Sequence, residues 1–363
     1  MGKVLFNDFE ISFEEILGGK WPSVNPYEEA TLLFCRYWLN GEQTFQLQTS
    51  GSTGIPKTIE VNRSQMESSA KATGQFFKVQ PDQLLLCCLN ISMIGGKMML
   101  VRGMEWDSQI HVVKPSSNPY SGFSPEKRVD FAGMVPLQLE ACLENESARK
   151  FLYQTENLII GGASLSQPIK EKAQTLPGNV YQTYGMTETV SHVALADIKK
   201  EGPLVYHALP GVSFSQSADH RLKIKGPMSD GKWLLTNDLV EMTSPSSFVW
   251  KGRADYTINS GGVKIQPEEV EASIHKTFQQ YFPGRQYLLV GLPDTRLGQK
   301  LVILVSGKAV MGSQTEDLLS TLKKELPTYH CPLEVHFLDQ FSETASGKIN
   351  RKETLNFYFK KVF

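Results

Sequence analysis

Apolar positions in the first half of the chain follow two spacings, one typical of helices and one typical of strands. Asn62 precedes one helical stretch as an N-cap, and Asn40-Gly41 ends another. Short apolar runs between the helical stretches predict buried strands. Residues 1–24 show neither spacing, so we expect an irregular lead-in there. The predicted helices span 26–39, 62–77, 97–103 and 136–153, and the predicted strands 45–47, 83–89, 110–113, 129–135 and 158–160.

This alternation of strands and helices predicts an α/β domain with a mostly parallel sheet. After Val205 the pattern changes to short strands separated by turns, which predicts a small β-rich subdomain. A second compact α+β unit is expected beyond Asp255. We therefore divide the chain into a large N-terminal domain, residues 1–254, and a small C-terminal domain, residues 255–363. The later strands are predicted at 180–181, 221–225, 233–235, 248–250, 287–292 and 301–306, and the later helices at 267–277 and 315–326.

Length, composition and charge narrow the class of protein. A chain of 363 residues is long for one hydrophobic core, which agrees with two domains. The net charge of −1, with scattered basic residues, offers no electrostatic basis for binding nucleic acid or an anionic membrane. No apolar run reaches transmembrane length, and the N-terminus lacks the apolar core of a signal peptide. Five cysteines without a CxxC pair indicate free thiols in a reducing compartment, so we expect a cytoplasmic protein.

A loop rich in hydroxyl groups and glycine is the first stretch with candidate chemistry. Its backbone amides and hydroxyl groups suit phosphate oxygens, and Lys57 adds a mobile positive charge. It differs from a Walker A loop because Pro56, and not glycine, precedes the lysine. Taken alone, a polar surface turn explains it equally well. The loop consists of Thr49, Ser50, Gly51, Ser52, Thr53, Gly54, Ile55, Pro56 and Lys57.

Four later stretches supply the other groups that a nucleotide site needs. Thr187 offers a hydroxyl group for phosphate, and Glu188 an oxygen ligand for Mg²⁺. Asp238 suits two ribose hydroxyls, and Arg253 is a fixed cationic fork. Lys348 lies on a glycine-flanked loop near the end of the chain. Each residue alone is better explained as a solvated or turn residue, but the five stretches in this order are improbable as an accident.

Together the motifs resemble those of the acyl-adenylate-forming enzymes, which include acyl- and aryl-CoA synthetases, adenylation domains and luciferases. The motifs are the loop ending Pro56-Lys57, the run Tyr184-Gly185-Met186-Thr187-Glu188, Thr236-Asn237-Asp238, Gly252-Arg253-Ala254-Asp255 and Gly347-Lys348. The resemblance extends from about Gln48 to Arg351. Within the family, the short chain and the run 182–189 most resemble the o-succinylbenzoate–CoA ligases of menaquinone biosynthesis.

The resemblance implies a role for each motif. The loop from Thr49 to Lys57 would hold the β- and γ-phosphates of ATP, and Thr187 the α-phosphate. Glu188 would bind Mg²⁺, and Lys348 would bridge the acyl carboxylate and the α-phosphate. Tyr184 and Gly185 would lie near adenine, with Gly161, Gly162 and Ala163 lining the acyl and adenine side. Asp238 and Arg253 would hold the ribose.

The resemblance also implies that the small domain rotates about Asp255. Gly261, Gly262 and Lys264 would then replace Lys348 at the site, close to the path of CoA. The acyl pocket is expected near residues 92–97, 134–138, 161–164 and 184–192. The second carboxylate of o-succinylbenzoate needs a partner there, for which Lys97, Arg102 and His192 are candidates. A solvated or structural role explains each of the three equally well.

The sequence departs from the family pattern in several places. The first loop begins at residue 49, much earlier than is usual, so a reduced N-terminal subdomain is expected. Asn237 replaces a glycine, which Asn tolerates because it also adopts left-handed conformations. Lys264 replaces an arginine that many members have, and Ser342 stands near the place of an expected proline. No candidate catalytic group is missing.

The expected reaction joins a carboxylic acid to a thiol in two steps, with ATP and CoA as co-substrates, Mg²⁺ as cofactor and AMP as a product. Three alternatives stay open. The first is an enzyme that acts on another acyl or aryl acid. The second is an enzyme that loads a carrier protein in place of CoA, and the third is a protein that binds nucleotide without turnover. The sequence does not indicate an oligomeric state.

Overall fold

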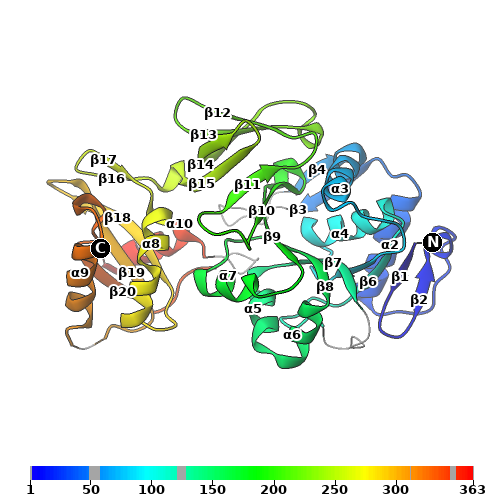
Figure 1. The fold of residues 1–363 in the computed structure, drawn as a ribbon, viewed down its shortest axis with the longest axis horizontal. Helices are drawn as coiled ribbons and strands as arrows, with labels where there is room; N and C mark the ends of the chain where they lie inside the picture. Colours follow the sequence, from blue (N-terminus) through cyan, green and yellow to red (C-terminus); the bar gives the residue numbers. More distant parts are fainter. Residues whose placement is uncertain (1, 49–57, 121–127, 311, 344–348, 363) are drawn as a thin grey trace.

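The described chain forms one large and one small β-sheet, each covered by helices on both faces, and a separate two-stranded sheet (Figure 1). This computed structural model describes residues 2–48, 58–120, 128–310, 312–343 and 349–362. In Figure 1 the small sheet lies at the left and the large sheet occupies the rest of the molecule. The result is the mixed α/β architecture that the sequence predicts.

The described residues of the large sheet form thirteen strands in the order β12-β13-β14-β15-β11-β10-β9-β8-β7-β5-β6-β1-β2. Neighbouring strands from β1 to β9 are parallel, and β2 pairs antiparallel at the edge. The strands of this half are β1 (Lys3–Leu5), β2 (Glu10–Ser12), β5 (Leu84–Cys87), β6 (Gln109–Val112), β7 (Val129–Met134), β8 (Thr155–Ile160) and β9 (Asn179–Gly185).

The parallel strands are buried on both faces because successive side chains point to opposite sides. Leu85 and Cys87 belong to one apolar core, and Leu86 and Cys88 belong to the other. The helices of the first core are α2 (Pro26–Leu39), α3 (Arg63–Phe77) and α4 (Ile94–Glu105), and those of the second are α5 (Pro136–Glu144), α6 (Glu146–Tyr153) and α7 (Gln167–Gln174).

The β-rich part after Val205 continues the same sheet with antiparallel strands. Its link to the parallel half runs through β10 and β11, because β10 pairs with β9 and β11 pairs with β15. The long hairpin of β14 and β15 pairs Asp238 with Arg253. The strands are β10 (His192–Asp197), β11 (Val205–Ala208), β12 (Ser213–Gln216), β13 (Arg221–Lys225), β14 (Leu234–Ser244) and β15 (Ser247–Arg253).

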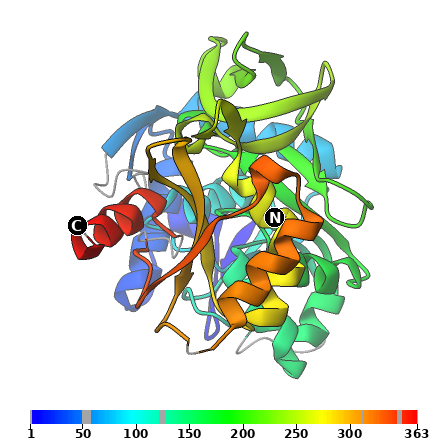
Figure 2. The same ribbon diagram turned by 90° about the vertical axis from the view of Figure 1, so that its left-hand side faces the viewer.

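The small sheet has α8 and α9 on one face and α10 on the other, which Figure 2 shows from the side of this sheet. Leu289 and Ile303 face the first layer, whereas Leu288 and Val302 face the second. Its elements are β16 (Ile258–Ser260), β17 (Val263–Ile265), α8 (Pro267–Tyr281), β18 (Tyr287–Asp294), β19 (Gly298–Ser306), α9 (Gln314–Glu325), β20 (Glu334–Leu338) and α10 (Arg351–Val362).

Two sequence-based expectations about local structure were wrong, and one strand was not predicted. The lead-in is regular, because β1 pairs with β6 and a capping box at Ser12 starts α1 (Phe13–Leu17). The helix expected over 136–153 is broken at Asn145, whose side chain caps the amide of Ala148 at 2.9 Å. A strand, β4 (Thr58–Asn62), precedes α3 and pairs with β3 (Thr44–Gln48).

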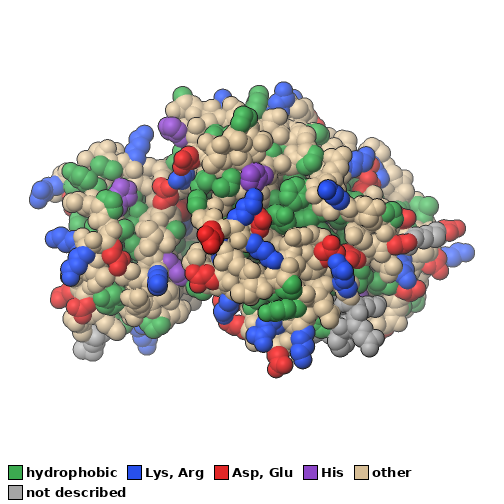
Figure 3. Space-filling view, viewed as in Figure 1, with side chains coloured by type: hydrophobic (Ala, Val, Ile, Leu, Met, Phe, Trp, Pro, Cys, Tyr) green, Lys and Arg blue, Asp and Glu red, His purple; other side chains and the backbone are tan. Residues whose placement is uncertain are grey.

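No helix in the described part of the chain is both long and apolar enough to cross a bilayer. Basic and acidic side chains are interspersed over the face seen in Figure 3, as expected from a net charge of −1.

Candidate active site

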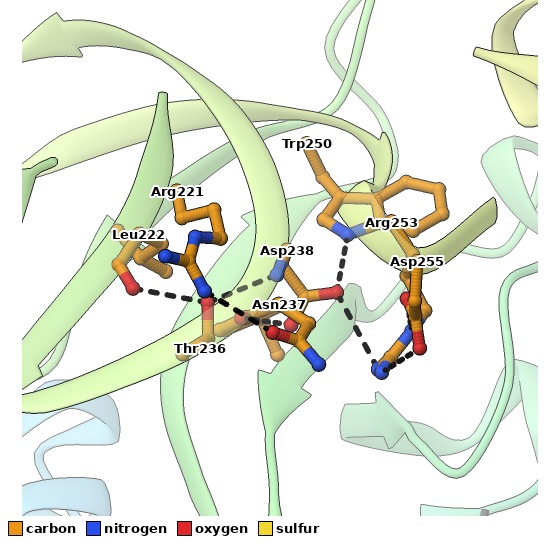
Figure 4. Close-up of polar contacts among 9 residues, drawn as sticks. Arg221, Leu222, Thr236, Asn237, Asp238, Trp250, Arg253 and Asp255 are labelled. Carbon is orange, nitrogen blue, oxygen red and sulfur yellow. Dashed lines mark hydrogen bonds and ion pairs between the residues drawn. The ribbon is translucent and has the colours of Figure 1, made fainter. Parts of the chain in front are cut away.

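Three side chains, Tyr184 from β9 and Trp250 and Arg253 from β15, meet at the Asp238 carboxylate on β14. We call these four residues the Asp238 corner. The Tyr184 hydroxyl donates to Asp238 Oδ2 at 2.7 Å, and the Trp250 indole Nε1 donates to Oδ1 at 3.0 Å. Arg253 Nη1 lies 4.0 Å from Oδ1. Figure 4 shows Trp250 and Arg253 converging on this carboxylate. The Asp238 carboxylate therefore accepts two hydrogen bonds and lies within ion-pair distance of Arg253, at the end of a β-hairpin.

Burial raises the pKa of Tyr184, and the neighbouring Asp238 carboxylate acts in the same direction. The phenol therefore stays protonated and donates to the carboxylate at neutral pH. The Tyr184 ring meets the rings of Tyr206 and Phe248 edge-on, with centroids 5.7 and 5.1 Å away. Sequence reasoning named Tyr184 and Asp238 separately, and the structure brings them into direct contact.

Arg253 is oriented mainly by Asp255. Its Nε and Nη2 atoms donate to Asp255 Oδ1 and Oδ2 at 2.9 and 3.0 Å, a two-pronged ion pair. The hydrogen bond to Asp255 raises the pKa of Arg253. The expected hinge residue thus fixes the guanidinium that stands beside Asp238.

Asn237 needs no left-handed backbone, contrary to expectation. It lies within β14 and is not among the residues with positive φ. Its side-chain oxygen instead accepts a hydrogen bond from Arg221 Nη1 at 3.4 Å (Figure 4). The substitution of Asn for glycine is therefore accommodated by ordinary strand geometry.

Thr187 and Glu188 lie on a one-turn 3-10 helix, η1 (Thr187–Thr189), between β9 and β10. The Thr189 hydroxyl closes this turn, donating to the Met186 carbonyl at 3.0 Å and accepting from the Met186 amide at 3.1 Å. Gly185 packs against the returning strand so closely that a Cβ would lie 2.4 Å from the Ser191 carbonyl oxygen. The turn presents Glu188 to solvent.

The Glu188 carboxylate fits Mg²⁺ only if a bound ligand supplies further oxygen atoms. No group of three or more His, Cys, Asp or Glu side chains suited to a metal occurs within the described ranges. Mg²⁺ is commonly bound by one or two carboxylates together with phosphates and water. The exposed carboxylate of Glu188 is suited to that mode of binding.

The glycines expected on the acyl and adenine side follow directly after β8. The Gly161 amide donates to the Met134 carbonyl at 3.0 Å, and a Cβ on Gly161 would lie 2.7 Å from Thr183 Oγ1. Gly162 has φ of +89°, and Ala163 is exposed. This segment thus lies at the carboxyl end of a parallel strand, beside the end of β9, where α/β folds commonly bind ligands.

The three candidates for a carboxylate partner do not form one cluster. Lys97 is half-buried and donates to the Gln46 carbonyl at 3.1 Å. Arg102 and His192 are buried, with exposed fractions of 2% and 6%, and contact each other at 3.3 Å. Among these three residues only Lys97 has a side chain within reach of solvent.

Gly261 and Gly262 form the two-residue turn of the β16–β17 hairpin. Their φ values of 59° and 83° are both positive, as a type I′ turn requires, which explains the glycine pair. The turn is exposed, and so is Lys264 on β17.

Two groups of predicted residues lie outside the described residues, namely Lys348 and the loop residues Thr49, Ser50, Gly51, Ser52, Thr53, Gly54 and Lys57. The described chain enters and leaves the loop through the β3–β4 hairpin, which pairs Gln48 with Thr58. On either side of Lys348, Glu343 and Ile349 form an antiparallel bridge.

Sequence reasoning missed two side chains at the Asp238 corner or beside it. Trp250 was predicted only as a strand residue, and its bond to Asp238 depends on the pairing of β14 with β15. Glu268 packs on the end of β15, because a Cβ on Gly252 would lie 2.8 Å from its Oε2. Burial raises the pKa of Glu268. Residues 267–277 were predicted as a helix, but no sequence signal placed Glu268 against Gly252.

The fold is that of an α/β protein, and the Asp238 corner is a candidate ligand site beside the carboxyl end of the parallel strand β9. Comparison with known families makes this specific. Residues 42–223 match the model of the AMP-binding enzyme family, and residues 286–348 match the C-terminal domain of AMP-binding enzymes. The chain belongs to the AMP-binding enzyme family, and it is an AMP-forming ligase.

The relatives point to one branch of this family. An acyl-CoA synthetase (AMP-forming)/AMP-acid ligase II-like protein from Dyadobacter fermentans is 37% identical, with a TM-score of 0.63, covering 94% of this chain and 97% of that one. A probable 2-succinylbenzoate–CoA ligase of Mycobacterium tuberculosis is 27% identical, covering 94% and 92%. O-succinylbenzoate CoA synthetase from Bacillus subtilis, in complex with ATP and magnesium ion, has the same fold, with 21% identity, a TM-score of 0.71 and coverage of 85% and 69%.

Proposed function

We propose that this enzyme activates o-succinylbenzoate with ATP and transfers the acyl group to CoA in menaquinone biosynthesis. The observation that carries a nucleotide-dependent reaction is the Asp238 corner, where residues from separate motifs converge on one carboxylate. The choice of acid rests on the relatives, of which several are 2-succinylbenzoate–CoA ligases.

In the first step, an oxygen of the acid carboxylate attacks the α-phosphorus of ATP, and pyrophosphate leaves with the bonding pair. Negative charge spreads over the phosphoryl oxygens, so catalysis consists mainly of positioning and charge stabilisation. Asp238 would accept from the ribose hydroxyls, Thr187 would donate to the α-phosphate, and Lys348 would neutralise the charge between carboxylate and phosphate. A bound Mg²⁺ ion, held by Glu188, would neutralise phosphate charge.

In the second step, the sulfur of the thiol attacks the carbonyl carbon of the acyl-AMP. The thiol proton passes to solvent, and AMP leaves with the electron pair of the broken C–O bond. The exposed Gly261-Gly262 turn suits a close approach of a thin thiol arm, since neither residue carries a side chain. Lys348 and this turn would serve different steps, with Asp255 as the hinge between residues 1–254 and 255–363.

A test separates the two steps. Lys348→Ala is expected to abolish acyl-AMP formation from acid and ATP while thioester formation from supplied acyl-AMP continues. Equal loss of both half-reactions in a folded variant would refute the role of Lys348.

Lys97 is the candidate partner for the second carboxylate of the acid. Of the three basic residues considered, it is the one with an accessible ammonium group, and its present acceptor is a neutral carbonyl. Burial lowers the pKa of Lys97, so a carboxylate beside it would favour its charged form. Arg102 and His192 bond to each other and to buried neighbours.

The proposed place of action is the cytoplasm. All five cysteines are free thiols, and Cys35, Cys87, Cys88 and Cys142 are buried. Free thiols are typical of a reducing compartment.

The deciding experiment measures AMP release from ATP and CoA with o-succinylbenzoate, benzoate, a fatty acid or no acid. We expect AMP release with o-succinylbenzoate only. Activity with another acid would keep the two-step mechanism and refute this substrate. Transfer to a carrier protein but not to CoA would change the acceptor. Nucleotide binding without AMP release with any acid or acceptor would favour a protein that binds nucleotide without turnover.

A further inference from the structure

Glu271 and Arg351 form a largely buried ion pair in the small domain. Arg351 Nη2 donates to Glu271 Oε2, and each of the two side chains is only 16% exposed. Glu271 lies on α8 and Arg351 is the first residue of α10, so the pair joins the helices that cover opposite faces of the small sheet. Removing two charges from water costs free energy, and a hydrophobic pair is often as stable. The pair therefore needs an explanation other than stability.

An edge strand of the described small sheet completes the contacts of the pair. Leu289 lies on β18, and its amide donates to Glu271 Oε1 at 2.6 Å. Arg351 Nη1 donates to the Leu289 carbonyl at 3.3 Å. The Arg351 guanidinium also lies 5.6 Å from the centroid of the Tyr256 ring. Arg351 is thus held by a carboxylate, a backbone carbonyl and an aromatic ring, which together fix its orientation.

Arg351 stands three positions after Lys348 in the sequence. The residue before it, Asn350, is 7% exposed, and its amide donates to the Ser342 carbonyl at 2.7 Å. The Asn350 side chain accepts from the Glu353 amide at 3.1 Å in the first turn of α10. The described chain that follows Lys348 is therefore tied to the small domain through Asn350 and, one residue later, through the ion pair of Arg351.

The other functional segment of the small domain has separate supports. The Gly261-Gly262 turn is held by the pairing of β16 with β17 and by a hydrogen bond from the Gly261 amide to the Leu297 carbonyl at 2.8 Å. None of these contacts involves Glu271 or Arg351. A change in the ion pair should therefore affect one of the two steps of the reaction and spare the other.

We propose that Glu271 and Arg351 are positioning residues for the formation of acyl-AMP. Glu271 orients the Arg351 guanidinium, and Arg351 fixes the start of α10 against β18, which sets the place of the chain that leads from Lys348. This inference rests on the proposed function, which gives Lys348 the first step and the Gly261-Gly262 turn the second. A merely structural role would affect both steps alike.

The variants change the charges of the pair and preserve its packing. Glu271→Gln keeps an oxygen that accepts from the Leu289 amide. Arg351→Met leaves a carboxyl group that can take up a proton, because burial raises the pKa of Glu271 to about 7 even though the charge of Arg351 opposes the rise. A double variant removes both charges. Asp339→Asn and Lys361→Met are matched controls, because this exposed pair also joins a carboxylate to α10, at 2.8 Å.

The two steps are measured separately. Circular dichroism and urea unfolding first verify that each variant is folded. Single-turnover pyrophosphate release, with ATP and the acid that the wild type accepts, gives the rate constant of the first step. AMP release from supplied acyl-AMP and CoA gives the rate constant of the second step.

For Arg351→Met we expect the first step to slow about 30-fold, because small displacements of a catalytic group have large effects on rate. Glu271→Gln should slow it about 10-fold. The double variant should resemble Arg351→Met, without a further 10-fold loss, because residues that act as a unit are not additive. The second step should stay within about twofold of the wild type in all three, and Asp339→Asn and Lys361→Met should match the wild type in both steps.

Two results would overturn the proposal. One is a wild-type first step in the folded variants, and Glu271→Gln alone decides this if Arg351→Met does not fold. The other is an equal loss in both steps, which would show that the pair only stabilises the small domain. If the wild type itself releases no pyrophosphate with any acid, the proposed function fails and this inference fails with it. Failure of the positioning role alone is seen only in the variants, beside an active wild type.

Discussion

The Asp238 corner and the buried cluster of Arg102, Ser191 and His192 have opposite electrostatics. At the corner, an anion at the end of a hairpin accepts two hydrogen bonds and lies within ion-pair distance of one cation. In the cluster, a cation inside the protein is surrounded by neutral acceptors. Asp238 is buried, but Tyr184, Trp250 and Arg253 are only half-buried, so they exchange more readily for ligand hydroxyls than the fully buried contacts of Arg102 do. The comparison therefore separates a carboxylate whose partners can exchange for a ligand from a guanidinium enclosed by the protein.

The largest effect is expected at the binding site. Asp238→Ala removes the carboxylate proposed to accept from ribose hydroxyls, and hydrogen bonds to charged groups are the strong ones. We expect kcat/KM for ATP to fall roughly 100-fold or more. Steady-state kinetics with varied ATP measure this. Asp219→Ala is the control, because Asp219 is an exposed carboxylate on the same β-rich part. An unchanged affinity for ATP in the folded Asp238→Ala protein would contradict the assignment.

A smaller effect is expected on the acyl side. Lys97→Met keeps the length and apolar stem of the side chain but removes the ammonium group. If Lys97 pairs with the second carboxylate of the acid, the KM for o-succinylbenzoate should rise about 10-fold with little change in kcat. The KM for ATP should not change. A Lys97→Met variant with a normal KM for the acid, or with a loss in kcat alone, would remove Lys97 from the acyl pocket.

The two regions also differ in how far the sequence predicted them. Asp238 and Arg253 belong to motifs whose carboxylate and guanidinium groups already indicate that they bind hydroxyl or phosphate oxygens. A hairpin brings the two motifs together. Lys97 and Arg102 share one helix, yet five residues correspond to about 140° of rotation, which places them on different faces. Sequence spacing indicates that angle but not which face is buried. Their separation follows from the packing of α4 against β10 and α3.

Long-range pairing explains the other differences. The strand β1 is only three residues long and depends on β6, which is more than one hundred positions later in the chain. No local pattern in residues 1–24 predicts that pairing. By contrast, α2 ends at Leu39, just before Asn40-Gly41, as predicted, because helix signals are local. The same reasoning explains why Tyr184 was recognised, while its bond to Asp238 was not.

The pH dependence of stability tests the burial of His192 beside Arg102. Burial lowers the pKa of His192 below its ordinary value of 6.5. Below that pH the unfolded chain binds a proton that the folded chain does not. His192 therefore contributes stability above pH 6.5 that is lost as the pH falls toward its folded-state pKa. The loss amounts to at most about 1.4 kcal/mol per pH unit.

Urea unfolding at pH 7.5 and 5.5 measures this contribution. His192→Gln keeps a donor and an acceptor but cannot titrate, so its free energy of unfolding should fall less between the two pH values than that of the wild type. His207→Gln, at an exposed position on β11, should leave the wild-type dependence unchanged. Equal pH dependence in the wild type and His192→Gln would show that His192 does not remain neutral in the fold.

The smallest effect is expected for Trp250→Phe, which removes one donor from the Asp238 carboxylate. Tyr184 and Arg253 remain, and the phenyl ring fills most of the space of the indole. Losing one hydrogen bond to a charged acceptor should raise the KM for ATP about fivefold. Trp233→Phe is the control, because Trp233 is half-exposed and its ring lies under the Lys225 ammonium group, away from Asp238. If Trp250 instead competes with ribose for Asp238, the variant would bind ATP as well as the wild type or better. That result would show that the ribose hydroxyls displace the Trp250 indole from the Asp238 carboxylate when ATP binds.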